Sequence, residues 1–280
     1  MDAYNHEEGV NRFTHFLENY PLRYFIRNSQ YWQYRCFGEG AETLLLLPGA
    51  PGLSSTSFQD ILFFESEFRI LVPDYPAQAT TLSEIVDSLA ELLTRLKIER
   101  VHLIGGSYGG LLAQDFVRRY PEKVSKLVLS HCSLPRRSRA RLLGWIAVLV
   151  RIFPEALIRT ITQAGLPIFM RGFPDQDGHW YACFAHVLAT LRKADYLARL
   201  HVHIDFDRCE AFSSDGPHAW KGQTLLIEAD DDPYTTESER AALQRLYPQA
   251  SVHTFHQTAH YAWASDPQPY FTLIKTFLLS

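Results

Sequence analysis

One serine is bracketed by glycines where a predicted strand meets a predicted helix. The apolar run 101–104 leads into Gly105-Gly106-Ser107-Tyr108-Gly109-Gly110, and apolar residues at helical spacing follow up to Pro121. A serine in so sharp a turn has its hydroxyl lifted above the sheet, and glycines two residues to either side avoid clashes with neighbouring backbone. A hydroxyl becomes a nucleophile when a base takes its proton and a third group orients that base. Ser107 is therefore our candidate nucleophile, and the alternative interpretation is a plain glycine-rich turn.

The candidate acid lies at the end of a later predicted strand. That strand, residues 224–227, runs into Glu228-Ala229-Asp230-Asp231-Asp232-Pro233, and ligands of open α/β sheets bind at the carboxyl ends of strands. We predict Asp232 as the orienting acid, because it lies directly before a proline that fixes the loop. Asp230 and Asp231 stay open as alternatives, and so does a solvated acidic turn without a catalytic role.

The candidate base is His260, which follows the last predicted strand, residues 252–255, and precedes a predicted helix. Histidine suits general-base catalysis near neutral pH, since its unperturbed pKa is about 6.5. The chain has twelve histidines, so position rather than residue type must decide between them. His253 is expected to point from the strand, whereas His256 is close enough to compete with His260.

Two backbone amides are expected to stabilise the oxyanion of a tetrahedral intermediate. One is the amide of Tyr108, directly after the nucleophile. The other is the amide of Ala50, in the loop Pro48-Gly49-Ala50-Pro51-Gly52 that follows the predicted strand 43–47. Glycines in this loop let the backbone approach a substrate closely.

Strands and helices alternate along the chain, which predicts a mostly parallel sheet covered by helices on both faces. The clearest helix covers residues 82–96, and Thr81 with Glu84 forms a capping box at its start. A second capping box, Thr236 with Glu239, begins a helix that ends before Pro248. The predicted strands are 43–47, 68–72, the run 101–104 before Ser107, 126–130, 224–227 and 252–255, with an antiparallel hairpin of 24–27 and 31–37 at one sheet edge.

The interval between the strands at 126–130 and 224–227 has helical patterns only, at 142–150, 154–162 and 178–192. We therefore predict a helical cap or lid over residues 132–220, inserted into a core made of residues 1–131 and 221–280. Four arginines open this interval, and they are suited to an anionic substrate tail or a membrane surface. The alternative is a solvated face of the lid. These arginines are Arg136, Arg137, Arg139 and Arg141.

Composition narrows the function classes. At 280 residues the chain is long enough for one large α/β domain with an insertion. A net charge of -4 gives no electrostatic case for nucleic-acid binding. The polar N-terminus has no apolar signal-peptide core, and the longest apolar run, 142–150, is too short to cross a bilayer. We predict a cytoplasmic enzyme without a transmembrane segment.

Metal and disulfide chemistry are not expected. The four cysteines lie far apart without a C-x-x-C pair, which argues against a zinc site and a disulfide scaffold. His201-x-His203 with Asp205 and Asp207 would share one face of a strand, but nothing else predicts a strand there. We therefore predict no metal and no cofactor.

These motifs together resemble the α/β-hydrolase fold family over nearly the whole chain. The resemblance rests on the elbow 105–110, the oxyanion loop 48–52, and an acid and a histidine that follow the serine in that order. The family usually carries His-Gly where this chain has Pro48-Gly49, which keeps the amide donor and removes a side chain that often braces the loop. The stretches 73–76, 101–114 and 246–248 are also similar to maspardin, a branch known mainly as a binding protein. Unlike that branch, this chain keeps a base at His260.

The predicted function is a serine hydrolase that cleaves a carboxylic ester or thioester of a small-molecule acyl substrate. Ser107, Asp232 and His260 would form its catalytic triad, and the amides of Ala50 and Tyr108 its oxyanion hole. The alternatives are an aminopeptidase or acyltransferase with the same triad, and a non-catalytic, maspardin-like binding protein. Acyl chain length and oligomeric state stay open.

Overall fold

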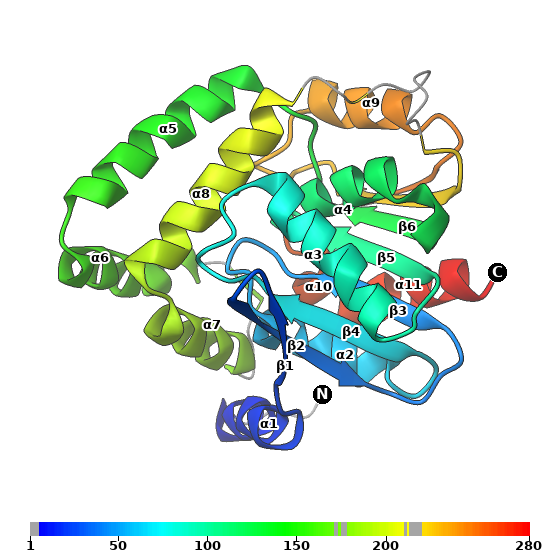
Figure 1. Cartoon of the computed structure of the whole chain (residues 1–280), viewed down its shortest axis with the longest axis horizontal. Coiled ribbons are helices and arrows are strands. Elements are labelled where there is room, and N and C mark those ends of the chain that lie inside the picture. The colour runs from blue at the N-terminus through cyan, green and yellow to red at the C-terminus, as the bar shows by residue number, and fades with distance from the viewer. Residues whose placement is uncertain (1–5, 171–172, 175–177, 210–211, 213–219) are drawn as a thin grey trace.

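The computed structural model describes residues 6–170, 173–174, 178–209, 212 and 220–280. Its centre is one sheet of eight strands in the order β1-β2-β4-β3-β5-β6-β7-β8 (Figure 1). The first two pairs, β1 with β2 and β2 with β4, are antiparallel, and all the others are parallel. The strands are β1 (Arg23–Arg27), β2 (Gln30–Phe37), β3 (Thr43–Leu47), β4 (Arg69–Asp74), β5 (Val101–Gly106), β6 (Val124–Ser130), β7 (Gln223–Ala229) and β8 (Ser251–Phe255).

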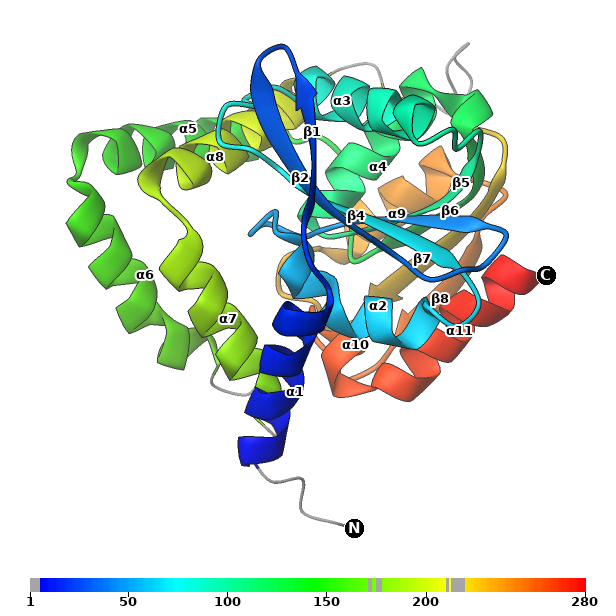
Figure 2. The ribbon, with the colours of Figure 1, turned by 60° about the horizontal axis from the view of Figure 1, so that its bottom comes forward.

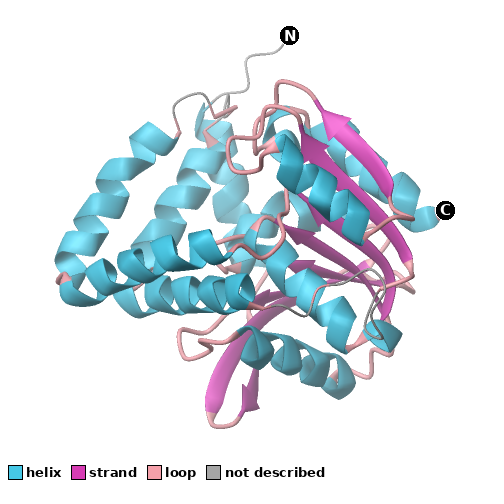
Figure 3. Ribbon diagram, turned by 90° about the horizontal axis from the view of Figure 1, so that it is seen from above, coloured by secondary structure: helices cyan, strands magenta, loops and turns pink. Residues whose placement is uncertain are grey.

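Helices cover both faces of this sheet (Figure 3). One face packs on α3, α4, α8 and α9, and the other on α1, α2, α7, α10 and α11. The α-helices are α1 (His6–Asn19), α2 (Phe58–Phe64), α3 (Leu82–Arg95), α4 (Tyr108–Arg119), α5 (Arg137–Ile152), α6 (Glu155–Phe169), α7 (His179–Thr190), α8 (Lys193–Arg208), α9 (Glu237–Leu246), α10 (Ala262–Ser265) and α11 (Pro267–Leu279).

Strand β3 shows why the central strands are apolar throughout. Leu45 and Leu47 enter the core on the α3–α4 side, and Leu44 and Leu46 enter the core on the α2–α11 side. A parallel strand buried on both faces needs such a continuous apolar run. The predicted mostly parallel sheet, the edge hairpin and both capping boxes are confirmed.

The helices α2 and α8 were not predicted. The short α2 lies between β3 and β4, and α8 covers a stretch considered for metal binding. Because α8 lies between α5 and the core, it buries charged side chains such as Arg199 and Asp207 beside apolar ones and shows no apolar stripe. Periodicity cannot identify a helix whose polar residues are themselves buried.

Four helices, α5 to α8, lie between β6 and β7 in the chain. In Figure 2, α5 and α6 lie along the outer edge, and α8 and α7 lie between them and the rest of the molecule. No helix in the described part of the chain is both long and apolar enough to cross a membrane.

Candidate active site

Ser107 lies in a strained turn between β5 and α4. Its φ and ψ are 49° and -118°, a conformation that L-residues with side chains rarely adopt. A side chain on Gly105 would place its Cβ 2.5 Å from the carbonyl oxygen of Gly109, and one on Gly109 would meet the carbonyl of Leu47 more closely still. The steric reason for both glycines is therefore confirmed. The Ser107 amide donates to the carbonyl of Ser130 at 2.9 Å, which ties the turn to β6.

The three aspartates after β7 have three different partners. Asp230 contacts Nδ1 of His256 at 2.6 Å in an exposed pair, and Asp231 accepts the amide of Ala259 at 3.0 Å. Asp232 Oδ2 lies 2.8 Å from Nδ1 of His260. Of the carboxylates that the sequence left open, only Asp232 contacts the predicted base.

The Asp232 carboxylate is enclosed by hydrogen-bond donors. Its side chain has no exposed surface, and Oδ1 accepts the amide of Tyr234 at 2.8 Å. Oδ2 lies near two imidazoles, since Nδ1 of His131 is 3.1 Å away. Burial alone would raise the pKa of Asp232, but hydrogen bonds from His131 and His260 outweigh it and hold that pKa well below its usual range. The carboxylate therefore stays ionised at neutral pH.

His131 is a site residue that the sequence analysis did not predict. It follows β6 directly, with a positive φ of 51°, and its amide donates to the carbonyl of Ile227 on β7. Burial lowers the pKa of His131 more than its hydrogen bond to Asp232 raises it, so the imidazole is neutral. Facing a carboxylate that only accepts, a neutral imidazole carries its proton on Nδ1. The available signal was its position, at the carboxyl end of the strand next to β5.

His131, Asp232 and His260 also offer three ligand atoms within 4.8 Å of one another. This donor set suits a divalent transition metal. An ion there would have to displace the Nδ1 protons of both imidazoles. The same contacts satisfy the carboxylate as hydrogen bonds, so the arrangement has a complete explanation in orienting the histidines.

Three of the four residues considered for a metal on α8 form contacts within the fold. Asp205 accepts the amide of Leu82 at 2.9 Å, at the start of α3, and Asp207 accepts Nε of Arg139 at 2.7 Å. His203 lies 3.8 Å from Asp207. These residues connect α8 to α3 and α5.

Both predicted oxyanion donors lie on the wall of the cavity that contains Ser107. Tyr108 is the first residue of α4, so its amide has no acceptor within that helix. The loop that carries Ala50 is held by Tyr75, whose amide donates to the carbonyl of Gly52 at 2.8 Å and whose hydroxyl donates to that of Pro48 at 3.2 Å. Tyr75 thus braces the loop where a histidine side chain is missing.

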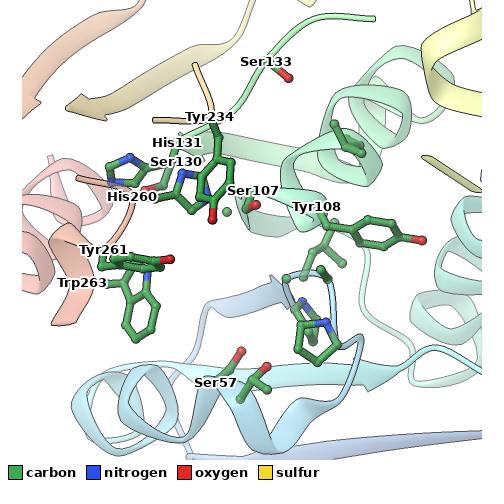
Figure 4. A pocket seen from close by; sticks show the side chains of 18 of the residues that line it. Ser57, Ser107, Tyr108, Ser130, His131, Ser133, Tyr234, His260, Tyr261 and Trp263 are labelled. Carbon is green, nitrogen blue, oxygen red and sulfur yellow. The ribbon is translucent and has the colours of Figure 1, made fainter. Parts of the chain in front are cut away.

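A cavity of about 620 Å³ joins these groups. Figure 4 shows Ser107, Tyr108 and His260 on its wall, with Tyr261 and Trp263 nearby and Ser57 on the side of α2. Much of the remaining wall is apolar, and Phe169, Trp180 and Phe184 contribute to it from the inserted helices.

Some charged side chains on this wall have partners of opposite charge, and one does not. Arg136 donates to Glu239 at 2.8 Å, and Arg139 is paired with Asp207. Asp60, on α2, also lines the cavity, but no cation in the described chain contacts its carboxyl group. Burial raises the pKa of Asp60 to about 7. Its own backbone amide donates to it, but among the described residues no cation neutralises it.

Comparison with known proteins places this geometry in context. A sequence model described as the alpha/beta hydrolase family matches residues 44–273. A 2-hydroxy-6-oxononadienedioate/2-hydroxy-6-oxononatrienedioate hydrolase from Escherichia coli K12 is 33% identical over 268 residues, covering 86% of this chain and 88% of its own. A 2-hydroxy-6-oxo-6-phenylhexa-2,4-dienoate hydrolase from Burkholderia cepacia is 24% identical over 264 residues, with coverage of 86% and 88%. Among solved structures, a hydrolase from Pseudomonas aeruginosa superposes with a TM-score of 0.74 at 19% identity, over 92% of this chain and 98% of that one.

Proposed function

The chain belongs to the alpha/beta hydrolase family, and from that premise we propose that it is a serine hydrolase cleaving a carboxylic ester or thioester. Membership of the family makes it a hydrolase that acts on a small molecule. The observation that carries the finer proposal is the contact of Asp232 with His260, together with Ser107 and His260 on one cavity wall. Ser107 is the nucleophile, His260 the base and Asp232 the group that orients it.

The proposed reaction has two halves. Asp232 accepts a hydrogen bond from Nδ1–H of His260, which leaves a free lone pair on Nε2. Nε2 takes the hydroxyl proton of Ser107 while the Oγ of Ser107 forms a bond to the substrate carbonyl carbon. The amides of Ala50 and Tyr108 stabilise the oxyanion. The alcohol or thiol leaves with the proton from His260, and water, deprotonated by the same histidine, then releases the acid and restores Ser107.

A fluorophosphonate probe tests the nucleophile directly. We expect it to label native protein, and not a heat-treated control, on the peptide that contains Ser107. Absence of labelling would support a non-catalytic binding protein instead. Comparing turnover of a p-nitrophenyl ester with that of an N-terminal prolyl amide separates an esterase from an aminopeptidase.

We propose that residues 132–220 form a lid on a core of 1–131 and 221–280. Phe169, Trp180 and Phe184 support this proposal, because they line the cavity from the inserted helices.

His131 is proposed as a positioning residue that acts through Asp232. Replacing His131 by Leu removes one of the two hydrogen-bond donors to Oδ2 of Asp232. The carboxylate is then held less firmly in one orientation, and its negative charge interacts more strongly with His260. We expect kcat to fall about tenfold. In the pH profile of kcat, we expect the acidic limb to move up by about half a pH unit or more. The measurement is a pH profile of kcat with a soluble aryl ester.

A conservative variant and a double-mutant cycle serve as controls for that prediction. His131→Asn keeps an amide donor near the position of Nδ1 and tolerates positive φ, so it should recover most of the activity. In an Asp232→Asn background, His131→Leu should add little, because both changes act on one contact. Additive losses, or an unmoved acidic limb, would contradict the proposed role.

A second candidate activity is hydrolysis of a carbon–carbon bond in a 2-hydroxy-6-oxo-dienoate. The observation in its favour is the 33% identity to the Escherichia coli enzyme of that name. The cavity charges argue against an anionic substrate of this kind. Arg136 and Arg139 are already paired, and a substrate carboxylate would enter a cavity whose wall carries Asp60 with no described cation beside it.

Asp60 therefore predicts a substrate preference. Between a neutral aryl ester and one with a terminal carboxylate, kcat/KM should favour the neutral ester by about tenfold or more. The preference should increase as pH rises through about 7, where Asp60 ionises. Asp60→Asn removes that charge, so its ratio should be smaller and independent of pH. A wild-type preference for the anionic ester would favour the dienoate activity instead.

A further inference from the structure

The two outer helices of the insertion, α5 and α6, expose a broad apolar surface. Of the eighteen large apolar side chains exposed in the described part of the chain, eleven lie between residues 142 and 169. Trp145, Ile152 and Ile168 are 71%, 69% and 66% exposed. Surface hydrophobic residues are usually scattered, and a concentration like this one marks an interaction site. We call it the α5–α6 face.

The pattern on each helix is amphipathic, with the apolar side turned outward. On α5, Leu142, Trp145, Leu149 and Ile152 recur at spacings of three and four residues, which puts them on one stripe. The opposite side of α5 packs on α8 through small residues such as Ala147. On α6, Leu157, Ile161 and Ile168 form a similar exposed stripe. Core packing therefore does not account for these apolar residues.

Positive charge accompanies the apolar stripes. Residues 136–170 contain six arginines and one acidic residue, Glu155. Arg136 and Arg139 pair with Glu239 and Asp207, and Arg159 lies 3.7 Å from Glu155. Arg141 and Arg151 are exposed on α5, and no described acidic side chain pairs with either. The α5–α6 face is thus apolar, and Arg141 and Arg151 add positive charge to it.

We infer that the α5–α6 face docks on an anionic lipid surface. An amphipathic helix rich in arginine, with an exposed tryptophan among its apolar residues, lies in the plane of the membrane interface. There the apolar side chains enter the acyl boundary while arginines reach the headgroups. Docking of a second copy through the same face is less favourable, because it would bring Arg141 and Arg151 of both copies together with no described acidic side chain paired to them.

The face also borders the substrate cavity. Phe169, at the end of α6, is exposed and lines the cavity. Arg136, just before α5, also lines the cavity. Docking would hold the cavity wall beside the lipid, where esters with long acyl chains partition. The docking itself does not depend on Ser107 being a nucleophile.

Co-sedimentation with vesicles tests this inference. Wild-type protein should sediment with vesicles of phosphatidylcholine mixed with phosphatidylglycerol, much less with phosphatidylcholine alone, and less as salt is raised. Arg141→Glu combined with Arg151→Glu should weaken binding by about tenfold or more. Trp145→Ser combined with Ile152→Ser should weaken it similarly, by removing apolar contact.

The matched control removes exposed apolar side chains elsewhere, by Tyr31→Ser combined with Val252→Ser, and should bind like wild type. All changes are at exposed positions, and thermal midpoints verify folding. The inference fails if wild type sediments with neither vesicle, or if the control loses as much binding as the Trp145–Ile152 variant. It also fails if light scattering finds a dimer that only the Trp145–Ile152 variant dissociates, since the face then joins two copies. Sedimentation measures binding to vesicles and not catalysis. Its outcome therefore does not depend on whether the fluorophosphonate probe labels Ser107.

Discussion

Replacing Ser107 by alanine is expected to lower kcat for a p-nitrophenyl ester by about 10⁴-fold or more, with KM little changed. The reason is that Oγ forms the bond to the substrate carbonyl, whereas the cavity wall that binds the acyl group is left intact. The residual rate comes from the oxyanion donors and from substrate positioning, which the variant retains. Stopped initial-rate assays at saturating ester, together with loss of fluorophosphonate labelling, measure the effect.

Ser57→Ala is the matched control for that variant. Ser57 also lines the cavity, but Figure 4 places it on the side of α2, away from Ser107. It should retain nearly full activity and labelling. A Ser107→Ala protein that keeps wild-type turnover, with a thermal midpoint showing that it is folded, would rule out the acyl-enzyme on this residue.

Local signals were sufficient for most of the architecture. The strand at β3 was predictable because burial on both faces demands an uninterrupted apolar run, and α3 because its stripe and its capping box agree. Gly105 and Gly109 were interpretable because the reason for a glycine is steric and local. By contrast, α8 has no one-sided apolar stripe, since its charged residues are buried between α5 and the core.

The site shows the same division. Asp232 and His260 were predicted from their places after β7 and β8, and the structure brings their side chains to 2.8 Å, while their catalytic roles stay predictions. His131 and Tyr75 were not predicted, because their importance depends on partners 101 and 27 residues away. For His131 the sequence offers only its place after β6, which does not specify its contact with Asp232. Charge was also misleading from sequence alone, because Arg136 and Arg139 are paired within the fold.

Asp232→Asn is expected to lower kcat by about 10³–10⁴-fold, and it tests which of the three aspartates is the acid. Oδ1 accepts the amide of Tyr234 and Oδ2 accepts two imidazole N–H groups, so every contact of this side chain requires an acceptor. An asparagine amide must turn its NH₂ toward one of these donors. If it faces His260, the proton moves to Nε2 and the base is lost. If it faces Tyr234, the geometry survives but the negative charge that stabilises the protonated base does not.

Asp230→Asn and Asp231→Asn are the matched controls for this prediction. Asp230 contacts an exposed histidine, His256, and Asp231 contacts a backbone amide at the edge of the same loop. Neither carboxylate contacts His260, so each variant should keep activity close to wild type. A loss in the Asp231 variant as large as in the Asp232 variant would mean that the loop as a whole, through the amide of Ala259, sets the position of the histidine. Each of the three variants must have a thermal midpoint well above the assay temperature, because a neutral amide at position 232 leaves buried donors unpaired and is itself expected to lower stability.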